Sequence, residues 1–300
     1  MTHLPSDRLA GLLEHFSVSA RTFQAGALCG INTIDAHEPF GQLHLIQRGA
    51  VEVHHGTAKP LRIDEPSLLL YPRPLPHRFV TDREHGADFV CAHVQFEGGA
   101  ANPIAAALPA VVHLPLHQLV SCQPLLQSLF DEAAASHCGR QAMLDRLFEA
   151  VLIHILRELM VQGRVQAGML AGMAHERLRK ALVAMHNMPQ REWTLEDLAD
   201  QAGMSRTVFA SAFRDTLGCT PGAYLQRWRI GLAQKRLRQG QTLKLIATEV
   251  GYGSEAALSR AFSAQTGLSP REWRKSQTPS SSGQVNDAPA TLHGQGPATR

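Results

Sequence analysis

The carboxy-terminal third of this 300-residue sequence contains one pattern twice, and that repeat constrains the fold more than any other feature. The second copy follows the first by 48 residues at its start and by 49 residues from its serine onward. The shared positions are Thr194, Leu195, Leu198, Ala199, Gly203, Ser205, Phe213, Gly218 and Pro221, which return as Thr242, Leu243, Ile246, Ala247, Gly251, Ser254, Phe262, Gly267 and Pro270. A period of this length indicates a repeated supersecondary unit, although two copies are too few for a solenoid.

Each copy predicts two short helices joined by a tight turn. A glycine ends the first helix, because glycine readily adopts the left-handed conformation of such a turn. Ser205 and Ser254 then stand where a hydroxyl can cap the second helix. Apolar residues four apart anchor that helix to a core, Phe209 with Phe213 and Leu258 with Phe262. This is the order of a helix-turn-helix, whose second helix enters the major groove of DNA; an ordinary helical hairpin is the alternative, which two copies in register disfavour.

The charge distribution and the connector between the copies agree with DNA binding. Residues 177–275 hold 16 Lys and Arg against 8 Asp and Glu, a net +8, whereas residues 1–176 hold 12 against 17, a net −5. Clustered positive charge attracts phosphates and releases counterions. Thr220 and Pro221 open a predicted helix that runs toward Gly240. Its roughly 18 residues span about 27 Å, close to one 34 Å turn of DNA, so both copies could read one face of a duplex.

The first hundred residues predict short strands in a closed or nearly closed β structure, with a proline-rich rim loop over 71–77. From about residue 116 the apolar period becomes helical, which predicts two amphipathic helices up to residue 161. We therefore expect a β domain over 1–115, a helical dimerisation or linker region over 116–172, an all-α domain over 173–276 and a disordered polar tail over 277–300. The fold class is α+β with several domains.

Composition limits the cellular setting. No stretch approaches the roughly 18 apolar residues of a membrane span, and residues 1–10 lack the pattern of a secretion signal. The five cysteines are irregularly spaced, which argues against a disulfide framework or a structural zinc site. A soluble, cytoplasmic protein with reduced thiols is expected.

The repeat resembles the AraC/XylS family of bacterial transcription regulators. The resemblance covers about 177–275 and rests on Trp193-Thr-Leu-Glu-Asp-Leu-Ala, on Trp228-Arg229 and on Val250-Gly-Tyr-Gly-Ser-Glu-Ala-Ala-Leu-Ser-Arg-Ala-Phe262, with Leu258 where the family often has Phe. It implies a regulator that binds promoter DNA and acts on RNA polymerase, more often as an activator. The residues that it places at DNA are Arg206, Thr207, Ala210, Ser211 and Arg214 in the first unit and Glu255, Ala256, Ser259 and Arg260 in the second.

Among these positions, Arg206 and Arg214 are expected near phosphates. The other residues are expected to face base edges. Arg260 could bind guanine through two hydrogen bonds, and Glu255 could accept a hydrogen bond from cytosine. The resemblance thus implies that Arg206 and Arg214 contribute mainly to affinity and that the other residues determine the preferred DNA sequence.

The segment Leu43-His-Leu-Ile-Gln-Arg-Gly-Ala-Val51 and its continuation through His93 resemble cupin barrels, which this family often carries as sensory domains. Metal-binding cupins use a His-x-His pair that this sequence lacks, so we expect no metal or other cofactor. His44, His77 and His93 are candidates for an effector pocket, although histidines satisfied by their neighbours are the alternative. Cys29 and Cys91 are candidates for redox sensing, as relatives with cupin domains resemble oxidant sensors; buried cysteines acting as small hydrophobes are the alternative.

The combined prediction is a non-enzymatic, sequence-specific transcription factor that responds to a small molecule or an oxidant. The helices over 116–161 would form a homodimer contact or simply pack internally. Two other functions are compatible with these residues. One is a cupin metalloenzyme with a helical accessory domain, and the other is an architectural DNA binder without sequence preference, which the mixed charge of the outward helix faces disfavours.

Overall fold

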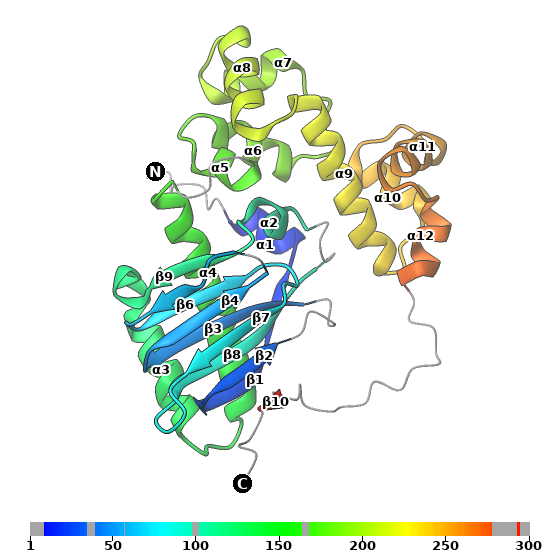
Figure 1. The fold of residues 1–300 in the computed structure, drawn as a ribbon. Helices are drawn as coiled ribbons and strands as arrows, with labels where there is room; N and C mark the ends of the chain where they lie inside the picture. Colours follow the sequence, from blue (N-terminus) through cyan, green and yellow to red (C-terminus); the bar gives the residue numbers. More distant parts are fainter. Residues whose placement is uncertain are drawn as a thin grey trace. The chain divides into compact units, whose positions relative to one another are not determined.

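The computed structural model describes residues 9–34, 40–56, 58–97, 102–163, 168–277 and 293–294. These residues form two compact units, one built from 16–163 with 293–294 and the other from 9–15 with 168–277. The first unit is rich in strands and the second is helical (Figure 1). None of the helices in the described part of the chain has the length and apolar content that crossing a membrane requires.

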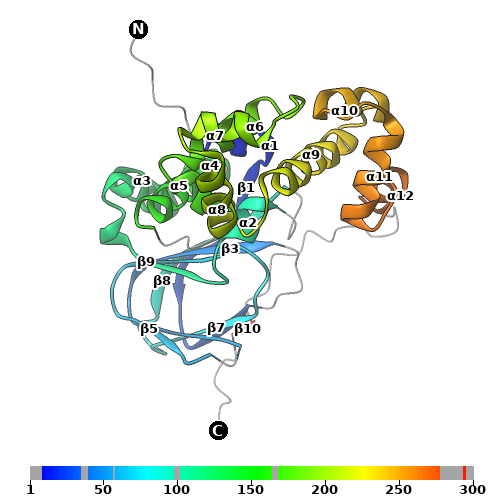
Figure 2. The ribbon, with the colours of Figure 1, turned by 90° about the horizontal axis from the view of Figure 1, so that it is seen from above.

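The first unit contains two antiparallel five-stranded sheets. The strands of one sheet, in spatial order, are β1 (Val18–Leu28), β8 (Ala87–Phe96), β3 (Gly41–Arg48), β6 (Ser67–Tyr71) and β9 (Val112–Pro115). The strands of the other sheet are β10 (His293–Gly294), β2 (Ile31–Ile34), β7 (His77–Thr81), β4 (Val51–His55) and β5 (Leu61–Ile63). Figure 2 shows the two sheets facing each other. Between them lies an apolar core that includes Ile46, Val53, Leu69, Phe79 and Phe89, all at most 1% exposed.

The predicted cupin-like β fold is confirmed, but in the described residues the strands form two sheets rather than one closed barrel. The proline-rich segment explains part of this separation. It connects β6 in one sheet to β7 in the other through residues 72–76, and its prolines cannot donate ladder hydrogen bonds. The predicted rim loop at this position is therefore confirmed.

The two helices that the apolar period predicted are present, and they pack beside the edge strand β1. They are α3 (Gln123–Ala134) and α4 (Arg140–Val161), preceded by α2 (Pro103–Ala107) and two 3-10 turns. An Asp145 carboxylate oxygen accepts from the amide of Thr22 at 2.7 Å, and a Glu149 oxygen accepts from the amide of Ala20 at 3.3 Å. The Gln141 amide donates to the Thr22 carbonyl at 2.9 Å. These side chains satisfy an edge that could otherwise pair with another strand.

The second unit contains nine helices among the described residues. They are α1 (Ala10–His15), α5 (Met169–Ala174), α6 (Leu178–Asn187), α7 (Leu195–Ala202), α8 (Arg206–Leu217), α9 (Pro221–Arg238), α10 (Leu243–Val250), α11 (Glu255–Thr266) and α12 (Pro270–Gln277). The pairs α7–α8 and α10–α11 are the two predicted repeats, and α9 connects them. Most of the segment predicted as a disordered tail lies outside the described residues, so that prediction stays untested.

Candidate nucleic-acid interface

The first helix pair is held at both ends by the residues that the sequence indicated. The Thr194 hydroxyl accepts from the amide of Asp197 at 3.0 Å, and the Asp197 carboxylate accepts from the amide of Thr194, also at 3.0 Å. Helix α7 ends at Gly203, whose φ of 62° is the left-handed conformation. Ser205 then caps α8 by accepting from the amide of Val208 at 3.5 Å. The predicted helix, glycine turn and capped helix are all present.

The second pair repeats this construction. Thr242 caps α10, which ends at Gly251 with a φ of 82°. Ser254 caps α11 by accepting from the amide of Ala257 at 3.1 Å. The connecting helix α9 begins at Pro221 after the Thr220 cap and is 18 residues long, as predicted. The sequence therefore specified both units and their connection through local signals.

The core residues decide which face of each second helix remains outside. Phe209, Phe213, Leu258 and Phe262 are each 0% exposed. Since residues four apart share one face of a helix, their burial turns the opposite face of α8 and α11 toward solvent. That outward face is the one available to a ligand of the unit.

Only some of the predicted DNA-contacting residues lie opposite the buried anchors, namely Thr207, Ser211, Ala256 and Arg260. Arg206, Ala210, Glu255 and Ser259 each stand three residues before an anchor and therefore flank the buried face. In α8, Arg206, Thr207, Ser211 and Arg214 are exposed and Ala210 is half-buried. Two of them already have partners within the chain. Arg206 forms an ion pair with Glu196 at 2.9 Å, and the Ser211 hydroxyl donates to Asp215 at 3.3 Å.

In α11 the corresponding residues gather at the amino-terminal half of the helix. Glu255, Ala256 and Arg260 are exposed, and Ser259 is half-buried. Glu255 is the first residue of the helix, directly after the Ser254 cap. This end of a recognition helix is the part that reaches base edges in helix-turn-helix proteins.

The candidate effector residues lie near one another in the strand-rich unit, with His93 close enough to His44 to contribute to the lowering of its pKa. His44 on β3 and His77 on β7 are buried, with their Nε2 atoms 3.0 Å apart. His77 Nδ1 lies 2.8 Å from the Leu75 carbonyl, which can only accept, so this nitrogen carries the proton. His44 Nε2 must then donate to His77 Nε2. His93 lies on β8 and stacks on Phe23 with ring centroids 4.3 Å apart.

Burial keeps this histidine pair neutral. Desolvation, with a smaller effect from neighbouring His77, holds the pKa of His44 well below its usual value. Desolvation also lowers the pKa of His77 to about 4. In this pair His77 can accept a hydrogen bond through Nε2 only while its ring is uncharged, which agrees with its lowered pKa. The lowered pKa of His44 keeps the donor ring uncharged as well.

Several buried polar atoms around this pair lack a hydrogen-bond partner among the described residues. They are His44 Nδ1, His55 Nδ1, the Tyr71 hydroxyl and Gln42 Oε1. Tyr71 stacks on His77 with ring centroids 4.0 Å apart. Within the described ranges, no group of three or more His, Cys, Asp and Glu side chains is arranged to hold a metal ion. What the described part of this cluster presents is a set of uncharged atoms that can form hydrogen bonds with a small molecule.

The two candidate redox cysteines are far apart. Cys29 is exposed and follows β1, whereas Cys91 lies in the core on β8, where burial raises its pKa. In the β1–β8 register Cys91 pairs with Gln24 and Ala87 pairs with Leu28. Cys29 is thus five residues along the strand from the partner of Cys91, a separation of about 16 Å. A disulfide needs Cα atoms within about 7 Å, so this arrangement does not bring the two thiols together.

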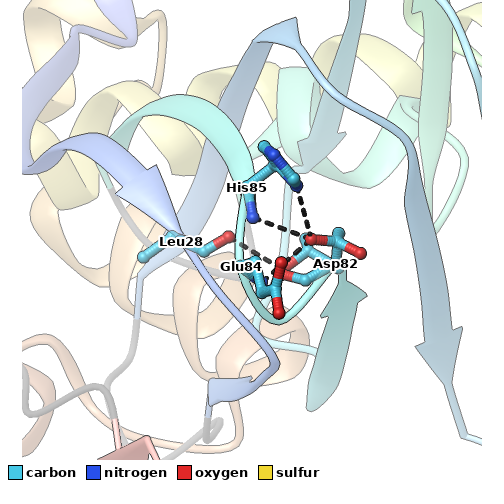
Figure 3. A network of polar contacts seen from close by, with 5 residues as sticks. Leu28, Asp82, Glu84 and His85 are labelled. Atoms are coloured by element: carbon cyan, nitrogen blue, oxygen red, sulfur yellow. Dashed lines mark hydrogen bonds and ion pairs between the residues drawn. The ribbon is translucent and has the colours of Figure 1, made fainter.

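Asp82 organises a corner after β7 (Figure 3). Cys29 lies beside this corner, next to Gly86. One Asp82 carboxylate oxygen accepts from the amides of Glu84 at 2.9 Å and His85 at 2.7 Å, and these hydrogen bonds lower the pKa of Asp82. A Cβ placed on Gly86 would lie 2.6 Å from Cys29 Sγ, so the thiol contacts this turn directly. The corner fixes the position of Cys29 while leaving it exposed.

Sequence reasoning missed the residues whose roles depend on distant partners. Gln42, His55 and Tyr71 belong to the histidine cluster although only His44 and His77 were singled out. A signal was present for Gln42, because it is two residues from His44 and alternate residues of a strand share a face. The edge-capping role of Asp145 and Glu149 had no comparable signal.

Two protein-family models agree with this architecture. A cupin family matches residues 7–161, and a helix-turn-helix domain family matches residues 198–276. The DNA-binding domain of AdpA, solved in complex with a target DNA, is 28% identical and covers 34% of this chain and 93% of that chain, with a TM-score of 0.32.

Among curated proteins, an AraC-like transcription regulator of Streptomyces lividans is 39% identical over 175 residues, covering 57% of this chain and 58% of the relative. The HTH-type transcriptional regulator AlkR of Acinetobacter baylyi is 36% identical over 202 residues, covering 65% of each chain. The chain thus spans about three-fifths of the length of these two relatives. The RCS-specific HTH-type transcriptional activator RclR of Escherichia coli K12 is 28% identical over 237 residues, covering 77% of this chain and 83% of the relative. The chain belongs to the AraC/XylS family of transcription regulators, with an amino-terminal cupin domain and a carboxy-terminal helix-turn-helix domain.

Proposed function

We propose that this protein binds specific promoter sequences in double-stranded DNA through α8 and α11. The observation that carries the proposal is the pair of helix-turn-helix units, in each of which the apolar anchors are buried and most of the predicted DNA-contacting residues are exposed. Thr207, Ala210 and Ser211 would read bases in one half-site, and Glu255, Ala256, Ser259 and Arg260 in the other. Arg206 and Arg214 would contact phosphates.

The exposed faces favour sequence preference over a purely architectural role. A protein that binds through phosphates alone needs little more than positive charge. Helix α11 instead presents an acidic side chain, a methyl group, a hydroxyl and a guanidinium within two turns. This mixture can distinguish base pairs through donors, acceptors and apolar contacts in the major groove.

The cupin domain is proposed to sense the signal. His44, His77 and His93 would line an effector pocket, and the unpartnered atoms of the histidine cluster would supply hydrogen bonds to a small molecule. Cys29 would be the first target of an oxidant, because it is exposed. Cys91 would join only after the strand-rich unit opens, since its thiol is buried. The name of RclR, an RCS-specific activator, supports a chemical signal and an activating role.

The remaining parts of the proposal concern assembly. The domain boundaries proposed from the sequence are 1–115, 116–172, 173–276 and 277–300. The compact units of the described residues instead place 9–15 and 168–172 with the helical unit. Helices α3 and α4 would include the homodimer contact, and activation would proceed through RNA polymerase at chromosomal promoters, hence in the cytoplasm. An effector can shift such a regulator only by binding its active and inactive arrangements with different affinity.

One selection experiment tests the DNA-binding core of the proposal. The full chain is used to select duplexes from random sequence, with and without added hypochlorite, and in parallel with Cys29→Ser. We expect enrichment of a defined site whose occupancy changes with oxidant in the wild type and not in Cys29→Ser. No enrichment above the starting pool would reject sequence-specific binding, and an oxidant response preserved in Cys29→Ser would remove that thiol from sensing.

A further inference from the structure

The guanidinium of Arg229 joins the two helix-turn-helix units. Arg229 lies on the connecting helix α9 and donates to three backbone carbonyls. Its Nε reaches the Pro189 carbonyl at 2.7 Å and one terminal nitrogen reaches the Arg191 carbonyl at 2.9 Å, both in the segment that leads into α7. The other terminal nitrogen reaches the Gly251 carbonyl at 3.2 Å, in the turn between α10 and α11.

The two backbone segments that Arg229 holds also touch each other. A Cβ built on Gly251 would lie 2.7 Å from Gln190 Cα and 2.9 Å from the Gln190 carbonyl oxygen. Only a glycine lets the turn between α10 and α11 approach the segment before α7 so closely. The Tyr252 ring lies under the same guanidinium, with its centroid 5.8 Å from the Arg229 Cζ atom.

This contact is placed where it can control the angle between the recognition helices. One held segment precedes α7 and the other directly precedes α11. Helix α9 packs against α8 on one side and against α10 and α11 on the other. Arg229 adds polar links from α9 to the segment before α7 and to the turn between α10 and α11. An ion pair between Arg236 and Glu249, at 3.3 Å, adds a second link between α9 and α10 only. Arg229, unlike Arg236, bonds both to the segment that leads into α7 and to the turn between α10 and α11.

We propose that Arg229 is a positioning residue that fixes the rotation of α11 relative to α8 and thereby makes the protein selective for the spacing between its two half-sites. The proposal depends on the proposed DNA-binding function. Adding one base pair between half-sites moves the second by about 3.4 Å and turns it by roughly 34° about the duplex axis. A rigid pair of helices loses one set of contacts on such a site, whereas a loosened pair can follow it.

The test compares affinities across a spacing series. The full chain binds duplexes that carry its selected site, or the same half-sites moved apart or together by one base pair. For the wild type we expect the shifted sites to bind at least about tenfold more weakly, since more than one base contact is lost. For Arg229→Gln we expect weaker binding to the selected site and a penalty for shifted spacing of only about twofold.

Arg227→Gln is the matched control, because it removes the same charge from the same helix while its side-chain partner is Cys219 in the first unit. It should keep the wild-type spacing penalty. Tryptophan fluorescence under heating gives the folded fraction of each variant, and Arg229→Lys, which keeps the charge but not the planar fork, replaces Arg229→Gln if that variant does not fold. A wild-type spacing penalty in the Arg229 variant would overturn the proposal. A wild type without sequence preference would instead reject the DNA-binding function itself.

Discussion

The buried histidine pair makes the stability of the cupin domain depend on pH in a calculable way. His77 has a pKa of about 4 in the folded protein, against about 6.5 in an unfolded chain. Because the folded value is depressed, the contribution of His77 is complete above about pH 6.5 and is lost as the pH falls toward 4. At about pH 5 the unfolded chain binds a proton at His77 that the folded protein does not bind. The free energy of unfolding is therefore about 2 kcal/mol lower at about pH 5 than at about pH 8.

Removing the titrating group should remove that pH dependence. We expect His77→Gln to be less stable than the wild type near neutral pH but to lose about 2 kcal/mol less between about pH 8 and about pH 5. His44 acts in the same direction, since its pKa is also lowered, so His44→Gln should flatten the dependence as well. Because either variant alone tests the prediction, the experiment remains decisive if one of the two does not fold.

The measurement must report on the strand-rich unit alone. All three tryptophans, Trp193, Trp228 and Trp273, lie in the helical unit, so their fluorescence does not follow the histidine pair. Hydrogen exchange of peptides from β3 and β7, measured over a series of urea concentrations, gives the free energy of opening of the strand-rich unit that holds His44 and His77. An equal pH dependence in the wild type and in both variants would refute the assignment of the buried neutral pair.

Other perturbations test the interface and its support. Arg260→Ala should cost about 1 to 3 kcal/mol of binding and relax preference at one base pair, whereas Arg214→Ala should weaken all sequences alike; affinities on matched and mismatched duplexes decide, and an unchanged preference after Arg260→Ala would end its assignment. Phe262→Ala should destabilise the helix-turn-helix pair α10–α11 by about 3 to 5 kcal/mol, because it empties a buried position. The urea midpoint of tryptophan fluorescence should fall, and a midpoint within error of the wild type would contradict the role of Phe262 as an anchor. Asp145→Leu should raise hydrogen exchange at the Thr22 amide, and unchanged protection there would show that the α4 carboxylate does not hold this edge.

The helical third could be predicted closely because its signals are local. Gly203, Ser205 and Ser254 act through bonds to residues within one turn of their own positions. The apolar anchors repeat at helical spacing, so the sequence also indicates which face is buried. Helix boundaries, turns and outward faces follow from such signals without knowledge of the rest of the chain.

The cupin domain could be predicted only in outline, because its site depends on register. His44 and His77 are 33 residues apart, and their contact requires β3 and β7 to lie in facing sheets. The separation of Cys29 from Cys91 likewise follows from the β1–β8 register. Arg229 illustrates the same limit in the helical unit, since its carbonyl partners are 22, 38 and 40 residues away. Strand content is local, whereas the pairing that creates a site is not.

Footprinting on the selected duplex tests most directly whether one chain reads DNA with both units. Hydroxyl-radical and guanine-methylation protection by the full chain should show two patches centred about 10 base pairs apart, both on one face of the duplex. Arg260→Ala should remove protection from only one of them. A single patch, or two patches on opposite faces, would contradict the account.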